Sequence, residues 1–137
     1  MDKALLLDTH VWIWLMNDGP QAIQAAALSR IEDSRTPLYV AAISAWEAAM
    51  LEAKGRIRLP VDCLEWIHRA LNAPRLSLLA LTPGIAVAST RLPGDVHGDP
   101  ADRILLATAR EHNLVLVTRD ERLLAYGTTG YVTTLPA

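Results

Sequence analysis

The sequence predicts an α/β fold of three layers, in which a central parallel sheet of four to five strands is covered by helices on both faces. The runs at residues 5–7 and 114–117 are continuously apolar, which is typical of strands buried on both faces of a parallel sheet. Segments with helical spacing of apolar residues separate successive runs. The 137 residues contain no internal repeat, low-complexity tract or linker, so we expect one domain spanning residues 1–137.

The first half of the chain alternates between expected strands and expected helices. A strand at Leu5–Leu7 ends at an acid, and a helix with Val11 to Met16 follows before the breaker Asp18-Gly19-Pro20. The Ala-rich segment from Gln21 to Asp33 has apolar residues at steps of three and four, which predicts one continuous helix. A second strand is expected at Leu38–Ile43, and a helix from Ser44 to Gly55.

The second half repeats this alternation. We expect a helix at Val61–Leu71, a third strand at Leu76–Leu81 and a short helix opened by Pro83. After a loop at 94–98, a strongly patterned helix at Pro100–His112 leads to the strand at 114–117, and a last short strand is expected at Tyr131–Leu135.

Composition narrows the class of protein. Cys63 is the only cysteine, which excludes a disulfide framework, a zinc ribbon and a paired-thiol redox site. The absence of a secretory segment or a membrane-spanning run favours a cytoplasmic protein without a membrane partner. Hydrophobic residues make up 51% of the chain, so an interface with a second copy or another partner is expected.

Four acids stand where the predicted strands give way to helices. Asp8 ends the first strand, Glu47 lies just after the second, Asp102 is in the first turn of the helix before the fourth, and Asp120 follows the fourth. Ligands of open parallel sheets bind beyond the carboxyl ends of the strands. These acids are therefore the candidate site residues.

Each acid also has a purely structural interpretation. Asp8 and Asp120 are suited to cap helices, and Ser44 with Glu47 fits a capping box. Asp99, Pro100 and Asp102 fit a cap, a first-turn proline and an acid favoured by the helix dipole.

Side-chain direction favours the functional interpretation. Glu47 shares a helix stripe with Met50 and Leu51, and Asp102 shares one with Leu105 and Leu106, so both should face inward. Several inward carboxylates need a neutralising cation, and oxygen ligands suit Mg²⁺ or Mn²⁺, which commonly bind substrate phosphates.

The net charge of the residues other than the four acids also favours a site that binds phosphates. The net charge is −2, so the remaining residues carry −2 + 4 = +2. A mildly basic surface around an acidic pit suits a nucleic-acid backbone. The candidate cations are the arginines at 56, 58, 69, 75, 91, 103, 110, 119 and 122.

Four motifs follow one another along nearly the whole chain. They are Leu6-Leu7-Asp8-Thr9-His10, Ser44–Ala49 with Lys54–Pro60, His97–Ala109, and Val117-Thr118-Arg119-Asp120. In this order and spacing they resemble the PIN-domain family, and within it the VapC-type toxins of bacterial and archaeal toxin–antitoxin pairs.

The resemblance implies a Mg²⁺- or Mn²⁺-dependent endoribonuclease. Its catalytic, metal-binding pocket would consist of Asp8, Glu47, Asp102 and Asp120, which are the same four acids. Thr118 would support the pocket, and Asp99 would be a metal ligand, an acid behind the ligands or only a helix cap. His10 fits the first motif, but a histidine one turn into a helix is more often structural, so we leave it out of the catalytic set.

The resemblance also implies partners. These are a small VapB-like antitoxin whose C-terminal segment wraps the toxin, a second copy of the chain in a homodimer, and transfer or ribosomal RNA as substrate. Hydrolysis by water would leave 5′-phosphate and 3′-hydroxyl ends. Gly98 and Ala101 stand where similar toxins often carry a basic residue and an aromatic one, so we expect the loop to bind RNA either less tightly or differently.

Two alternatives use the same fold class. One is a catalytically degenerate PIN-fold module that only binds RNA. The other is an Asp-based phosphatase or phosphoacceptor domain. The sequence disfavours the second, because no second Asp follows Asp8 by two residues and no lysine accompanies Thr118-Arg119-Asp120 at the end of the fourth strand.

Overall fold

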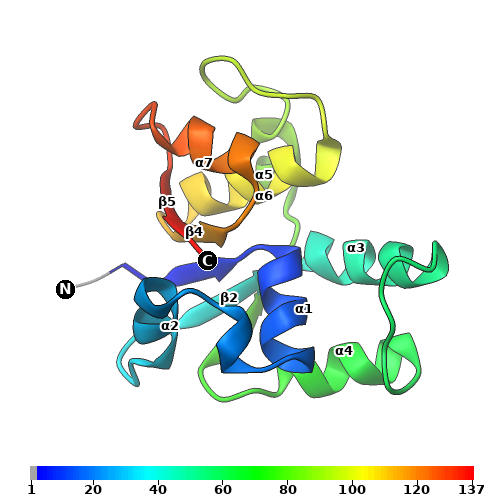
Figure 1. The fold of residues 1–137 in the computed structure, drawn as a ribbon. Helices are drawn as coiled ribbons and strands as arrows, with labels where there is room; N and C mark the ends of the chain where they lie inside the picture. The colour runs from blue at the N-terminus through cyan, green and yellow to red at the C-terminus, as the bar shows by residue number, and fades with distance from the viewer. Residues whose placement is uncertain (1–2) are drawn as a thin grey trace.

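The computed structural model describes residues 3–137 and contains a five-stranded, entirely parallel sheet in the order β3-β2-β1-β4-β5 (Figure 1). This confirms the predicted parallel sheet and shows five strands among the described residues. The strands are β1 (Leu5–Leu7), β2 (Leu38–Ala41), β3 (Leu76–Leu79), β4 (Val115–Thr118) and β5 (Thr133–Pro136).

Helices cover both faces of the sheet, as predicted (Figure 1). One side carries α1 (Thr9–Asn17), α2 (Ala25–Glu32) and α4 (Cys63–Leu71), with α3 (Ala42–Ala53) continuing from β2. The other side carries α5 (Pro83–Ala88), α6 (Pro100–Glu111) and α7 (Glu121–Gly127). Among residues 3–137, no helix is long and apolar enough to cross a membrane.

The continuous apolar runs of β1 and β4 reflect burial on both faces. Leu5 and Leu7 belong to the core under α1, α2 and α4, whereas Leu6 between them belongs to the core under α6 and α7. All three leucines are 0% exposed. Because successive side chains in a strand point to opposite faces, a strand between two helical layers must be apolar at every position.

Both ends of α6 are fixed by local hydrogen bonds. The Asp99 side chain accepts from the backbone N–H of Asp102 at 3.1 Å, as an N-cap does. At the other end Asn113 adopts φ 54°, and its N–H donates to the Arg110 carbonyl while that of Leu114 donates to Ala109. This pair of bonds is a Schellman motif, which satisfies the last carbonyls and ends the helix one residue before the predicted His112.

The predicted continuous helix at Gln21–Asp33 is wrong. Residues 20–22 form a short 3₁₀-helix, Ile23 is extended with φ −110° and ψ 140°, and α2 begins only at Ala25. The extended backbone turns the Ile23 side chain into the core, where it is 6% exposed. Helix propensity is weak compared with burial of an apolar side chain, so packing decides the break.

The capping box offered as the structural interpretation of Ser44 and Glu47 is not formed. The helix already begins at Ala42, directly after β2, so Ser44 lies within its first turn and Glu47 within its second. Helix α7 at Glu121–Gly127 is not among the helices with predicted bounds, although the capping interpretation of Asp120 implies a helix there. Several other bounds shift by one or two residues: strand 2 ends at Ala41 instead of Ile43, strand 3 at Leu79 instead of Leu81, strand 4 starts at Val115, strand 5 at Thr133, and α4 at Cys63.

Arg75 connects β3 to the end of α2. Its guanidinium donates to the carbonyls of Ile31, Asp33 and Thr36 at 2.7, 2.8 and 2.7 Å.

We predict that Arg75→Ala lowers the free energy of unfolding by about 2 kcal/mol, because three carbonyls lose a charged donor. Urea denaturation measures this. Arg69→Ala, which removes an exposed ion pair with Glu65 on α4, should cost less than about 1 kcal/mol; equal losses would contradict the prediction.

Candidate active site

The site lies where the chain direction across the sheet reverses. From β1 the chain continues to β2 and β3 on one side, whereas β4 and β5 lie on the other. The carboxyl ends of β1 and β4 therefore flank a switch point, which is where open parallel sheets bind ligands. Asp8 follows β1 directly, and Thr118 is the last residue of β4.

Asp8 is held by both strands. Its backbone N–H donates to the Val117 carbonyl at 2.9 Å, and its Oδ2 accepts from the Thr118 hydroxyl at 2.7 Å. Its Oδ1 accepts from the N–H of Thr9 at 2.7 Å, so Asp8 is also the N-cap of α1. The residue is only 7% exposed, and this burial raises its pKa despite the bonds from Thr118 and Thr9.

Glu47 comes from α3 and faces the same place. Its Oε1 lies 2.5 Å from the hydroxyl oxygen of Thr9, which in turn lies 2.8 Å from that of the buried Ser44. Burial raises the pKa of Glu47 to about 7; the Thr9 bond opposes this shift, and the charges of Asp8 and Asp102 add to it. The inward direction predicted for this acid is confirmed.

Asp102 lies on the third side, at the start of α6. Its Oδ2 is 2.8 Å from Nε2 of His97 and 3.8 Å from Nη2 of Arg122. The side chain is 13% exposed, and burial raises its pKa although the His97 bond acts in the opposite direction. Arg103 does not pair with it: this guanidinium donates to the carbonyls of residues 89, 96 and 97 and so fixes the loop that carries His97.

Asp120 completes the set from the start of α7. Its Oδ1 accepts from the N–H groups of Arg122 and Leu123 at 2.8 and 3.3 Å, and its Oδ2 is 3.5 Å from Nη2 of Arg122. Partial burial alone would raise its pKa, but these backbone bonds and the Arg122 charge outweigh it and lower the pKa. Asp120 is thus the acid of the four that is most readily ionised.

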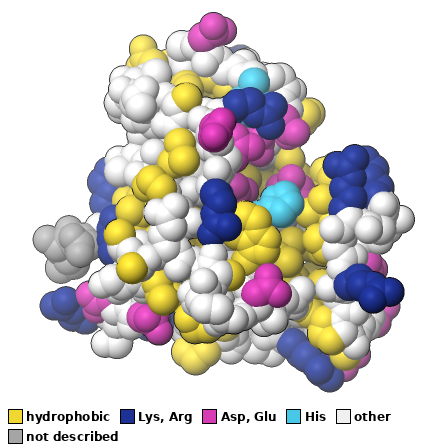
Figure 2. Space-filling view, viewed as in Figure 1, with side chains coloured by type: hydrophobic (Ala, Val, Ile, Leu, Met, Phe, Trp, Pro, Cys, Tyr) yellow, Lys and Arg dark blue, Asp and Glu magenta, His cyan; other side chains and the backbone are white. Residues whose placement is uncertain are grey.

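The four predicted acids line one cavity of about 560 Å³. Figure 2 shows acidic side chains inside this hollow, between the α6–α7 side and the α1–α3 side of the molecule, with basic side chains near its rim. Asp99, predicted as a fifth candidate, lines the cavity too, while Thr118 lies beneath it on Asp8. The structure therefore brings together every acid that the sequence singled out.

The rest of the cavity is apolar and basic. Trp14, Met50 and Leu51 line it together with Arg56, Arg119, Arg122 and His10. Arg119 is held in place: its guanidinium lies 4.3 Å from the ring centroid of Trp14 and donates to the carbonyls of Ala22 and Ala137. Arg122 is held less closely, since its side chain is 61% exposed and its ion pairs with Asp102 and Asp120 are 3.8 and 3.5 Å long.

The oxygen donors of the four acids suit a hard cation, although their side chains do not form a complete coordination site. Within residues 3–137, no three His, Cys, Asp or Glu side chains stand so that they could hold a metal ion as they are. The acids nevertheless supply only oxygen donors, and no Lys or Arg ion pair is formed by Asp8 or Glu47 among the described residues. Carboxylates that share a cavity with few direct cations fit Mg²⁺ or Mn²⁺, which use few carboxylates and several waters.

Three residues contact the acids directly in a way that the sequence did not indicate: Thr9 and His97 were not among the candidates, and Arg122 was one only as a cation for nucleic acid. Thr9 and His97 stand within the quoted motifs, and Arg122 follows Asp120 by two positions, but nothing in the spacing shows that they reach a carboxylate. Arg103 and Arg119 adjoin Asp102 and Asp120 in the sequence, but their guanidiniums donate to backbone carbonyls instead.

Comparison with known proteins agrees with this geometry. The PIN domain family model matches residues 5–128. Ribonuclease VapC22 of Mycobacterium tuberculosis is 40% identical over 123 residues, which cover 90% of this chain and 92% of the relative.

Solved structures share the fold at lower identity. VapBC2 from Rickettsia felis, bound to a DNA fragment from its promoter, matches with a TM-score of 0.69 and 13% identity over 97% of this chain and 98% of the other. FitAcB from Neisseria gonorrhoeae matches with a TM-score of 0.59 and 22% identity over 96% of both chains. With the family model covering most of its length and a relative at 40% identity, the chain belongs to the PIN-domain family.

Proposed function

We propose that this chain is a VapC-like toxin, an endoribonuclease that hydrolyses RNA phosphodiester bonds with the help of Mg²⁺ or Mn²⁺. The observation that carries the proposal is the gathering of Asp8, Glu47, Asp102 and Asp120 around one cavity at the switch point of the sheet. The 40% identity to a ribonuclease supports the activity.

The four carboxylates would hold the divalent ion, with Thr118 fixing Asp8 and Thr9 fixing Glu47. Such an ion would polarise a phosphate oxygen and make water a stronger nucleophile. His97 orients Asp102 through the bond at 2.8 Å, and the Arg103 bonds hold the loop of His97. Asp99 acts as the cap of α6 and adds negative charge behind Asp102.

The basic and apolar half of the cavity would bind the RNA. Arg56 and Arg122 line it and can meet backbone phosphates, and Arg122 can exchange its long contacts with Asp102 and Asp120 for a phosphate. Met50 and Leu51 offer an apolar surface for bases. Arg119 is bound within the fold, so its contribution is the position of Trp14.

The proposed partners are a VapB-like antitoxin and a second copy of the chain. The matched structure from Rickettsia felis is a VapBC complex, which supports the antitoxin. Large exposed apolar side chains, including Trp46, Leu64 and Val87, are available for such interfaces. We also propose that residues 1–137 act as one domain in the cytoplasm.

Asp102→Asn is predicted to lower the rate of cleavage of labelled transfer and ribosomal RNA by more than about 100-fold in Mn²⁺ or Mg²⁺. The reason is that the variant loses the negative charge of one carboxylate that would hold the metal. The wild type should leave 5′-phosphate and 3′-hydroxyl ends and lose activity in EDTA. Asp95→Asn, in the exposed loop before α6 and outside the cavity, is the matched control. Full activity of Asp102→Asn would remove this residue from the site, and 2′,3′-cyclic phosphate ends would refute attack by water. RNA binding without cleavage by the wild type would favour the degenerate module.

The pKa of Glu47 predicts how stability depends on pH in the metal-free protein. Because its pKa is raised from 4.5 to about 7, the folded state holds a proton that the unfolded state has lost between these values. The free energy of unfolding should therefore fall as the pH rises through this window, by about 3 kcal/mol at most. Urea denaturation in EDTA at several pH values measures the slope. Glu47→Gln should flatten it and Glu52→Gln, on the same helix, should not; an unchanged slope in Glu47→Gln would contradict the assignment.

His97 is predicted to be a positioning residue for Asp102. His97→Ala should weaken Mn²⁺ binding, followed by electron paramagnetic resonance in the absence of RNA, by about tenfold, the range typical of groups that orient metal ligands. His97→Gln keeps a donor and should recover part of the loss. If both variants bind Mn²⁺ like the wild type, the contact serves only the fold.

A further inference from the structure

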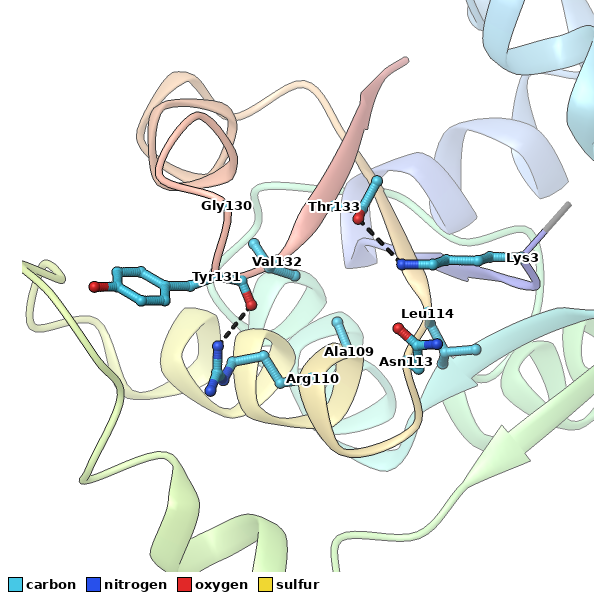
Figure 3. Close-up of a pocket in the computed structure, with 9 residues that line it drawn as sticks. All are labelled: Lys3, Ala109, Arg110, Asn113, Leu114, Gly130, Tyr131, Val132 and Thr133. Carbon is cyan, nitrogen blue, oxygen red and sulfur yellow. Dashed lines mark hydrogen bonds between the residues drawn. The ribbon is translucent and has the colours of Figure 1, made fainter.

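A second cavity lies at the opposite edge of the sheet from the acids. It has a volume of about 220 Å³ and is formed where the strands begin: Lys3 precedes β1, Leu114 precedes β4 and Thr133 opens β5 (Figure 3). The last turn of α6 contributes Arg110, and the turn before β5 contributes Gly130 and Tyr131. We call it the amino-edge pocket.

The amino-edge pocket is lined by cations without a carboxylate among its lining residues. Figure 3 shows the Lys3 ammonium directed at the hydroxyl of Thr133, 3.4 Å away, and the Arg110 guanidinium directed at the carbonyl of Tyr131, 2.6 Å away. Within residues 3–137, neither cation forms a salt bridge. Both therefore keep positive charge and free N–H donors for an anion.

The carboxyl end of α6 does not cancel the positive charge of Lys3 and Arg110. Helix C-termini usually repel anions because their last carbonyls are unpaired. Here the Schellman bonds from Asn113 and Leu114 occupy the carbonyls of Arg110 and Ala109, and the N–H of His112 occupies that of Thr108. The turn beside the pocket is also open, because Gly130 at φ +89° has no side chain and an added Cβ there would meet nothing within 4 Å.

The pocket continues into a neighbouring hollow of about 320 Å³. The two share Lys3, Asn113 and Leu114, and the second extends to His112 and Tyr39. On the outer side, Tyr131 is 44% exposed, and the Arg110 guanidinium lies 5.9 Å from the centroid of its ring. Cations, amide and hydroxyl groups beside an exposed aromatic ring match a phosphate with its adjoining nucleobase more fully than a carboxylate.

We propose that the amino-edge pocket binds a backbone phosphate of the RNA at a point remote from the acid cavity. This rests on the proposed function. Asp102 and Arg110 lie on the same helix, eight residues apart, which is about 12 Å along its axis. At about 3.4 Å per stacked nucleotide, a strand of only about four nucleotides spans that axial distance. One RNA chain can therefore reach both the acid cavity and the amino-edge pocket. The pocket would favour substrates that extend several nucleotides beyond the bond being cut.

The test follows backbone amide resonances of the ¹⁵N-labelled chain in EDTA, so that cleavage plays no part. The probes are inorganic phosphate, hexaglutamate and a 2′-O-methyl oligoribonucleotide of about twelve nucleotides. An oligonucleotide of this length is long enough to reach from the acid cavity to the amino-edge pocket along a curved path. We expect phosphate and the oligonucleotide to shift Asn113, Gly130 and Tyr131, with the oligonucleotide binding more tightly than phosphate. Asp102→Asn should leave these shifts unchanged.

Variants separate a specific pocket from general charge. Arg110→Gln should weaken binding of the oligonucleotide about tenfold and reduce the slope of log affinity against log salt by about 0.7. Lys3→Gln, outside every helix and strand, should act similarly. Arg69→Gln on α4 removes the same charge and is the control. Equal effects of Arg110→Gln and Arg69→Gln would overturn the proposal.

Three outcomes with the wild type would also overturn it. In the first, the oligonucleotide shifts only resonances around the acid cavity. In the second, it binds no more tightly than phosphate. In the third, hexaglutamate alone shifts the pocket resonances, which would indicate an acidic protein segment as the ligand. Failure of RNA cleavage would be a separate result, because the pocket shifts are read without catalysis. Cleavage that depends on Asp102 with an unresponsive pocket would leave the proposed function standing and refute only this inference.

Discussion

The hydroxyl of Thr118 ties together the two central strands and two of the acids. It donates to Oδ2 of Asp8 at the end of β1 and accepts from the N–H of Asp120 at 3.1 Å. Thr118 is 0% exposed, so this hydroxyl has no water to replace either bond. A buried carboxylate at the switch point is tolerated because a buried donor faces it, and the same hydroxyl fixes Asp120 beside Asp8.

Helix capping and site chemistry use the same carboxylates here. Asp8, Asp99 and Asp120 each cap a helix, and each also lines the cavity. In Asp8 and Asp120 one oxygen accepts the backbone bonds, while the other faces a side chain of the site. The capping interpretation and the functional one were framed as alternatives, but a carboxylate with two oxygens satisfies both. Capping fixes the side chain, which is what a metal ligand requires.

Patterns that depend on burial were predictable from the sequence. The parallel sheet followed from the continuous apolar runs, and the convergence of Asp8, Glu47, Asp102 and Asp120 followed from the rule that strand ends meet at one edge of a sheet. Contacts that depend on side-chain reach were not. A flexible arginine can bond to any of several neighbours, so the sequence could not show that Arg103 clamps a loop whereas Arg122 meets two acids. The break at Ile23 was missed for a similar reason, because long-range packing overrode a helical pattern.

Helix α6 relates the two edges of the molecule. Its first turn carries Asp102 and so places an acid at the carboxyl edge of the sheet, while its last turn carries Arg110 at the amino edge. Because the helix is capped at both ends by Asp99 and Asn113, it behaves as a rod of about 18 Å, and the spacing of the two charges is set by the backbone. A net charge of −2 hides this separation of sign. An extended polyanion that meets the cavity arginines at one edge would find further positive charge along α6, so overall charge is a poor guide to what this surface binds.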